Sequence, residues 1–444
     1  MRIVALMLAV GISWIGNAQQ VNKTQEKFDK YELKLVTKDV KVLSNNKMEG
    51  RETGTNGEKL AAEYIAKRMK EMRLKPYGIG GYFQEFTFTP RTNPHAHGPD
   101  STKKPITGKN VIGYWDNGAE HTIVIGAHYD HLGYGGEGSL HPNKNEIHNG
   151  ADDNASGIAG LLSLARTLPG MIQYKNNNYL FIAFSGEEKG LWGSKSFIKN
   201  PTIPLSKINY MINMDMIGRL DSNKLAINGV GTSTLWPIAL DMTMNRICVN
   251  PNALTTSESD NRIGFDEITT QNDRWNLVLG KSGIGPSDHT SFYLEGIPVL
   301  HFFTGQHSDY HKPGDDFEKV NMEGIVAIRN FIISIIGKLD KKGKLDYVKT
   351  KSDKSSKAPR FKVTLGVMPD YMFQGEGMRI DGVIPDRPAE KAGLKKGDVV
   401  VKMGEVEIND MHSYMKGLAQ YESGDTTQVE VIRNNNKIKV DVTF

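Results

Sequence analysis

The feature that most constrains the fold of this chain is the alternation of short apolar segments with longer segments of helical periodicity. The short segments are rich in residues typical of buried strands, and they lie at 111–114, 122–127, 179–184, 208–214 and 297–303. The longer segments carry apolar side chains at helical spacing, and they lie at 25–41, 56–73, 156–168, 191–198 and 324–339. Strands that alternate with helices predict an α/β sheet covered by helices on both faces.

The first 18 residues have the pattern of a signal peptide. Arg2 precedes a mostly apolar run over residues 3–15, and Gly16 and Ala18 supply small residues before a polar pair. The run is shorter than the roughly 20 residues that a membrane-spanning helix needs, so a membrane anchor is the weaker alternative. We therefore expect an exported protein, periplasmic or extracellular, without a stable membrane anchor.

Charge and cysteine content narrow the class of protein further. The net charge of +4 over 444 residues is small, so nucleic acid is not an expected partner. Cys248 is the only cysteine, which excludes an intramolecular disulfide. A single cysteine of this kind is more often a small buried residue than a nucleophile.

The chain divides into four predicted parts. The signal peptide covers 1–18 and the α/β domain covers 19–339. Residues 340–360 are rich in Lys, Ser and Asp and predict a charged linker. Residues 361–444 combine short strands, turns and one helix, and they are numerous enough for a small β-rich domain.

Polar residues that suit a metal site follow the first long strand. His128 comes directly after the segment 122–127, and Asp130 stands two residues further on. Functional groups of α/β sheets gather beyond the carboxyl ends of the strands. At this spacing Asp130 can orient the ring of a metal-binding histidine.

Two pairs of adjacent carboxylates occupy comparable places. Asp152 and Asp153 lie in a polar turn that opens the helix at 156–168, and one capping residue would explain only one of them. Glu187 and Glu188 follow the strand at 179–184. Neighbouring glutamates repel each other, and a cation removes that cost if one binds it while the other remains a base.

Asp215 and His311 complete the pattern. Asp215 directly follows an apolar strand, where a buried carboxylate without a partner would be unfavourable. His311 follows the last strand through a short turn and can close the site. Nitrogen and oxygen ligands without thiolates suit zinc, with manganese or cobalt as substitutes.

Together these motifs resemble the di-zinc aminopeptidases of metallopeptidase clan MH, of the bacterial leucyl aminopeptidase type. The resemblance covers roughly residues 25–339 in order and spacing. It implies the zinc exopeptidase fold, with a mixed, mostly parallel sheet, and two Zn²⁺ ions per chain.

The resemblance also implies ligand roles. His128 and Asp215 would hold one ion, and Glu188 and His311 the other. Asp153 would bridge the two ions, and the peptide bond after it would be cis.

Four further residues take supporting or catalytic roles by the same resemblance. Glu187 would be the general base that activates a metal-bridged water, and Tyr310 would hydrogen-bond the oxyanion. Asp130 would hold His128 from behind, and His289 would support the pocket wall. The implied activity is removal of N-terminal residues from peptides.

Three alternatives remain open. Aminopeptidases and carboxypeptidases of this group share all five ligands, so the ligands alone do not decide which end of a peptide is cut. A single-zinc cyclase of N-terminal glutamine uses the same scaffold. A non-catalytic peptide-binding protein led by its C-terminal domain is the third.

Residues 361–444 resemble a bacterial-type PDZ domain. The segment 383–400 carries the most specific part of the resemblance, and 410–418 would be the groove helix. The loop Leu365-Gly366-Val367-Met368 looks like the one that binds a peptide carboxylate. Such domains add an extended peptide to a sheet edge, so peptide or protein C-termini are expected partners, with a packing module as the alternative.

Overall fold

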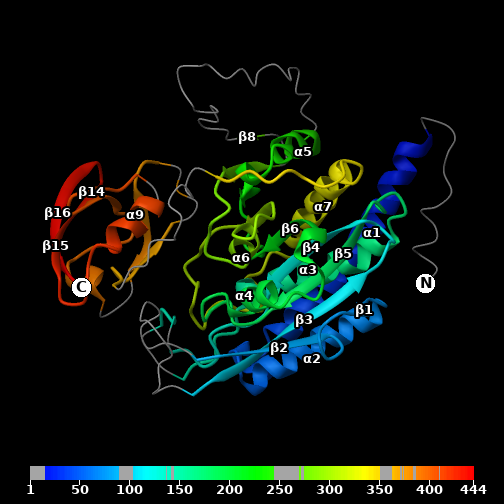
Figure 1. Ribbon diagram of the computed structural model, residues 1–444, viewed down its shortest axis with the longest axis horizontal. Helices are drawn as coiled ribbons and strands as arrows, with labels where there is room; N and C mark the ends of the chain where they lie inside the picture. The colour runs from blue at the N-terminus through cyan, green and yellow to red at the C-terminus, as the bar shows by residue number, and fades with distance from the viewer. Residues whose placement is uncertain are drawn as a thin grey trace.

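A ten-stranded sheet forms the centre of the larger domain in a computed structural model of the chain (Figure 1). The strand order is β1-β3-β5-β4-β6-β10-β7-β9-β8, with β2 paired to β3. The strands are β1 (Lys75–Pro76), β2 (Phe83–Phe88), β3 (Ile106–Trp115), β4 (His121–His128), β5 (Asn177–Phe184), β6 (Ile208–Met214), β7 (Lys224–Asn228), β8 (Thr270–Gln271), β9 (Asn276–Gly280) and β10 (Val299–Phe303).

The structure describes residues 16–89, 104–136, 138–141, 145–244, 270–271, 275–350, 363–370, 373, 375–383, 387–409 and 411–444. Most of the predicted signal peptide, Cys248 and the second half of the predicted linker lie outside these residues.

The direction of the strands confirms a mixed sheet with a parallel centre. β4 pairs in parallel with β5 and β6, and β6 pairs in parallel with β10. Antiparallel pairs of β3 with β5 and of β10 with β7 flank this centre. The central strands β5 and β6 are buried along their whole length, and mostly apolar, because helices cover both of their faces.

Helices pack on both faces of the sheet, as predicted (Figure 1). One face is covered by α1 (Gly16–Leu43), α2 (Asn56–Glu71), α3 (Gly157–Thr167), α5 (Leu235–Thr243) and α7 (Met322–Leu339). The opposite face is covered by α4 (Trp192–Lys199) and α6 (His289–Tyr293), which contribute Phe197 and Phe292. Stacking of these two rings, with centroids 5.7 Å apart, fills the space under the shorter helices.

The ends of some elements differ from the sequence-based expectations. The helix α2 ends at Glu71, two residues before the predicted end, and Thr55 caps its start, because the Thr55 side chain accepts a hydrogen bond from the Glu58 N–H at 3.4 Å. The first half of the predicted linker packs on the larger domain. Leu345 is buried in its core, and Asp346 accepts a hydrogen bond from Ser233 at 2.7 Å. A charged composition therefore did not prevent this segment from docking.

The C-terminal domain has its own sheet and core, as predicted for a PDZ domain. The strand order is β11-β12-β13-β15-β16, with β14 paired to β13. The elements are β11 (Val367–Pro369), β12 (Met378–Val383), α8 (Pro388–Lys391), β13 (Val399–Met403), β14 (Val406–Glu407), α9 (Met411–Leu418), β15 (Thr426–Arg433) and β16 (Asn436–Thr443). Gly366, in the predicted carboxylate loop before β11, has φ +76°, which favours glycine.

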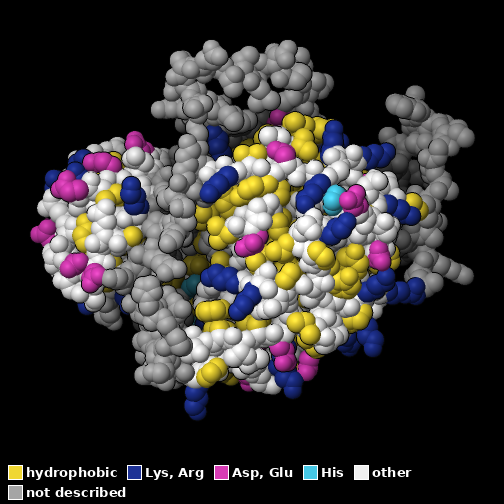
Figure 2. Space-filling model, in the orientation of Figure 1, with side chains coloured by type: hydrophobic (Ala, Val, Ile, Leu, Met, Phe, Trp, Pro, Cys, Tyr) yellow, Lys and Arg dark blue, Asp and Glu magenta, His cyan; other side chains and the backbone are white. Residues whose placement is uncertain are grey.

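Figure 2 shows one face of the molecule, on which Lys and Arg side chains lie interspersed with acidic and apolar ones. They form no continuous basic patch on this face, in keeping with the small net charge. Among the described residues, no helix combines the length and apolar character needed to cross a membrane.

Candidate metal centre

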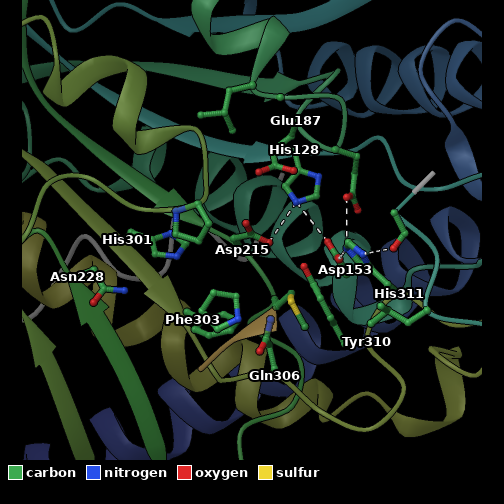
Figure 3. A pocket seen from close by; sticks show the side chains of 18 of the residues that line it. His128, Asp153, Glu187, Asp215, Asn228, His301, Phe303, Gln306, Tyr310 and His311 are labelled. Atoms are coloured by element: carbon green, nitrogen blue, oxygen red, sulfur yellow. Dashed lines mark hydrogen bonds and ion pairs between the residues drawn. The ribbon is translucent and has the colours of Figure 1, made fainter. Parts of the chain in front are cut away.

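The central strands bring the predicted ligands to one edge of the sheet. His128 is the last residue of β4, Glu188 follows the end of β5, and Asp215 is the first residue after β6. Because β4, β5 and β6 are parallel neighbours, their carboxyl ends lie side by side. Asp153 reaches the same place from the turn before α3, and His311 from the loop after β10 (Figure 3).

One group of donor atoms contains His128, Asp153 and Asp215, whose donor atoms lie within 4.8 Å of one another. The His128 Nε2 atom is 3.1 Å from Asp215 Oδ1 and 3.3 Å from Asp153 Oδ1. An imidazole and two carboxylates in this arrangement are a donor set that fits zinc.

A second group of donor atoms lies on the other side of Asp153. The His311 Nε2 atom is 3.3 Å from Asp153 Oδ2 and 3.3 Å from Glu188 Oε2. The two oxygens of Asp153 thus face different groups, which is the geometry that a bridging ligand requires. The bridging role itself stays a prediction from the family resemblance.

His131 belongs to the second group and was not among the predicted ligands. Its Nδ1 atom is 2.8 Å from Glu188 Oε1 and 3.8 Å from Asp153 Oδ2. Its Nε2 atom is buried without a hydrogen-bond partner in the described structure. The sequence signal was present, since His131 shares the turn after β4 with His128, but two histidines in one turn do not reveal which ring points inward.

Charge and burial give the two adjacent glutamates different pKa values. Burial alone would raise the pKa of Glu188, but the charge of His311 and hydrogen bonds from the histidines lower it to about 2. Burial raises the pKa of Glu187 well above its usual range, and the carboxylates of Asp215 and Glu188 add to this while His128 opposes it. Environments that shift the pKa values of two neighbouring carboxylates in opposite directions indicate different chemical roles for them.

Asp153 is held ionised by its neighbours. Burial opposes ionisation, but contacts with His128 and His311 outweigh it and keep the pKa of Asp153 well below its usual range. An ionised carboxylate between two imidazoles is the form in which it can bind cations.

Asp130 lies beneath the site, where the sequence placed it. Its Oδ1 atom is 3.7 Å from His128 Nδ1, and its backbone carbonyl is 3.2 Å from the same nitrogen. The same carboxylate accepts hydrogen bonds from the Glu187 N–H at 3.2 Å and the Thr53 hydroxyl at 2.9 Å. Asp130 therefore positions both the His128 ring and the loop that carries Glu187.

Tyr310 approaches the donor groups from the side opposite Glu187 (Figure 3). Its ring stacks on that of His311, with centroids 3.9 Å apart, and its hydroxyl points toward Asp153 and Asp215. Burial raises the pKa of Tyr310 well above its usual range, and the surrounding carboxylates add to this. The hydroxyl therefore keeps its proton and can donate a hydrogen bond.

His289 lies behind the pocket wall and not beside a predicted ligand. Its ring stacks on His301 with centroids 4.3 Å apart, and His301 lines the cavity. Burial, with the neighbouring His301, lowers the pKa of His289 well below its usual range. Next to it, burial raises the pKa of Asp288 to about 7. Support of the pocket by His289 stays a prediction.

A carboxylate outside the donor groups fixes the turn that carries Asp153. Asp315 Oδ2 accepts the backbone N–H groups of Asp152 and Asp153 at 2.9 and 3.0 Å, and Arg219 donates to Asp315 Oδ1 at 3.0 Å. The peptide bond between Asp153 and Asn154 is cis, as the family resemblance implied.

Replacing Asp315 with alanine is expected to lower the free energy of unfolding by about 2–6 kcal/mol. The change leaves two buried N–H groups without an acceptor, at about 1–3 kcal/mol each. Urea unfolding followed by fluorescence measures this. Asp316→Ala is the matched control. The Asp316 carboxylate accepts one partly buried hydrogen bond from the Asn149 side chain, so an effect under about 1 kcal/mol is expected. Equal losses in the two variants would contradict the role of Asp315.

A cavity of about 440 Å³ opens beside the donor groups. Besides the predicted ligands and Glu187, its wall includes Asn228, His301, Phe303, Gln306, Val367 and Pro369. The last two residues belong to β11 of the C-terminal domain. Among the described residues that line the cavity, none is Arg or Lys.

Two protein families match this chain. The model of peptidase family M28 matches residues 110–336, which is more than half of the chain, and the model of the PDZ domain matches residues 351–444. Both matches agree with the two sheets described above.

Individual relatives are distant. Aminopeptidase YwaD of Bacillus subtilis (strain 168) is 26% identical over 252 residues, which are 54% of this chain and 46% of that protein. The alkaline phosphatase isozyme conversion protein of Escherichia coli (strain K12) is 29% identical over 186 residues, 41% of this chain and 51% of that protein. The match thus spans about half the length of each of these two relatives.

A solved structure with the same fold is that of a zinc aminopeptidase from Bacillus subtilis, which superposes with a TM-score of 0.51 at 17% identity. The superposition covers 72% of this chain and 98% of that one. At this identity it supports the fold alone. The parallel strand ends, their imidazole and carboxylate donors and the family match agree, and the chain belongs to peptidase family M28, with a PDZ domain at its C-terminus.

Proposed function

We propose that this chain is an exported, zinc-dependent aminopeptidase that removes N-terminal residues from peptides. The observation that carries the proposal is the carboxylate of Asp153 between two donor groups, with Glu187 beside them. The Glu187 side chain makes no hydrogen bond to the described residues and is therefore available as a base. His128 and Asp215 would hold one ion, and Glu188 with His311 or His131 the other.

The chemistry assigned to the chain follows from these positions. When bound, the two ions supply Lewis acidity, which makes water more acidic and polarises the peptide carbonyl. Glu187 accepts the proton of the attacking water and passes it to the leaving amine. Tyr310 donates a hydrogen bond to the carbonyl oxygen as negative charge develops on it.

The charges of the cavity favour cleavage at the N-terminus over cleavage at the C-terminus. Its described wall contains the carboxylates of Asp153, Glu187, Glu188 and Asp215, and no Arg or Lys. A carboxypeptidase needs a cation for the terminal carboxylate of its substrate, whereas carboxylates attract a terminal ammonium group. The presence of donors on both sides of Asp153 also argues against a single-zinc cyclase.

Metal analysis combined with a substrate panel tests the proposal. The purified full chain is expected to hold about two zinc ions and to hydrolyse aminoacyl-anilides, because both donor groups are complete. The matched control is the same anilide with its α-amine acetylated, which should not be cleaved.

Three outcomes would contradict the proposal or a part of it. Equal cleavage of the blocked substrate would exclude the aminopeptidase part. Cyclisation of N-terminal glutamine without anilide hydrolysis would point to the cyclase. Absence of both bound metal and turnover would favour a peptide-binding protein led by its PDZ domain.

A further inference from the structure

The cavity at the metal centre has one wall that comes from the other domain. Val367 and Pro369 of β11 line it together with His311, Tyr310 and Gln306. In the primary sequence, β11 lies more than fifty residues beyond His311 and outside the segment that matches family M28. The PDZ domain is therefore part of the substrate cavity and not a separate module at a distance from it.

β11 is an edge strand, and its register shows which side is unpaired. It stands at the end of the strand order and pairs only with β12 among the described strands. The N–H of Asp370 donates to the Arg379 carbonyl of β12 at 2.8 Å. Because backbone groups alternate along a strand, those of Met368 also face β12, and those of Val367 and Pro369 face the open edge.

The peptidase domain already contacts this open edge. With its amide nitrogen turned toward two acceptors, Gln306 donates to the Pro369 carbonyl at 3.2 Å and to Asp381 Oδ2 at 2.9 Å. Gln306 lines the same cavity as the metal-binding side chains (Figure 3). The open edge of β11 therefore adjoins the peptidase cavity at Gln306.

The direction of the strand suits a substrate whose N-terminus is in the cavity. A peptide paired antiparallel to β11 has its C-terminal side beside Val367, which also belongs to the predicted carboxylate loop, and its N-terminal side beside Pro369. The Pro369 end is the one that Gln306 ties to the peptidase domain. The peptide would thus extend from the metal centre along β11 without reversing direction.

We propose that the open edge of β11 binds the substrate downstream of the cleaved bond, as an added strand, so that the enzyme prefers peptides several residues long. The proposal rests on the proposed aminopeptidase function. Val367 would form a two-bond pair with one substrate residue, through its N–H and its carbonyl. Pro369 has no N–H and would only accept.

A length series measured on the full chain tests the proposal. The substrates are leucine p-nitroanilide and the C-terminally amidated peptides Leu-(Ala)n, with n from 1 to 6. Amidation removes the carboxylate, so capture of a carboxylate by the loop before β11 does not contribute. We expect kcat/KM to rise about tenfold once the peptide reaches β11 and then to level off, since the added hydrogen bonds together have about this effect.

Backbone N-methylation of the longest peptide locates the pairing without changing the protein. Successive residues are about 3.3 Å apart and alternate in direction, so methylation should lower kcat/KM about tenfold at alternate amides only. In the protein, Val367→Pro removes the donor and should reduce the gain with length. Val367→Ala is the matched variant that keeps the N–H and should retain the gain.

The outcomes separate this proposal from the one on which it rests. Hydrolysis of the anilide without any gain for longer peptides would overturn the added strand and leave the aminopeptidase intact. An increase in kcat/KM with peptide length that persists when any one amide is N-methylated would also overturn it. Absence of turnover with every free-amine substrate would remove the aminopeptidase function, and this inference with it.

Discussion

Replacing Glu187 with glutamine is expected to lower kcat about 10²- to 10⁴-fold while the bound zinc stays unchanged. Glutamine has nearly the same shape but cannot accept the proton of the attacking water. The Glu187 side chain contacts neither donor group through a hydrogen bond in the described structure, so its loss should not release metal. Steady-state hydrolysis of an aminoacyl-anilide, together with metal analysis of the same sample, measures both quantities.

Two controls distinguish the loss of a catalytic base at Glu187 from a structural effect of the substitution. Glu120→Gln changes an exposed glutamate, 74% accessible, and should have the activity of the unchanged protein. The backbone N–H of Glu187 donates to Asp130, and this bond survives the substitution. An unchanged kcat for Glu187→Gln would disprove its role as the base, and a parallel loss of zinc would reassign it as a ligand.

Replacing Asp153 with alanine is expected to abolish turnover and to reduce the bound zinc from about two ions per chain to fewer than about one. The two oxygens of Asp153 face different donor groups, at 3.3 Å from His128 and 3.3 Å from His311. A single substitution therefore removes an oxygen ligand from both groups. Metal analysis after dialysis at a fixed free zinc concentration measures the effect.

Two further variants make the result for Asp153 specific. Asp215→Ala removes an oxygen from the His128 group alone, so one ion should remain at the Glu188 group. Asp221→Ala changes an exposed aspartate and should retain both ions and full activity. If Asp153→Ala retained as much zinc as Asp215→Ala, the bridging position would be refuted.

The two domains are expected to act on the same peptide. If β11 contributes to the substrate cavity, the PDZ domain determines peptide length, and the metal centre determines which bond is cleaved. This division gives the PDZ domain a role that neither carboxylate capture nor a packing module would supply. The length series decides between these interpretations, because only the added strand predicts sensitivity to backbone methylation.

The sequence by itself determined the α/β class and the position of the donor residues. Apolar strands that end at or shortly before His128, Glu188 and Asp215 predict a shared edge, because the carboxyl ends of neighbouring parallel strands meet there. The strand periodicity is local, so it can be read without knowing which strands are neighbours. The small β-rich domain could be separated from the larger one for the same reason.

Only the tertiary structure decided which side chains meet across long separations. Asp315 accepts hydrogen bonds from a turn 162 residues earlier in the chain, and His131 points at Glu188 from another strand end. Gln306 contacts β11 of the other domain, which no local pattern indicates. These contacts depend on how strands are ordered and where loops return. Local periodicity specifies a strand and its end, whereas its neighbours are selected by packing of the whole chain.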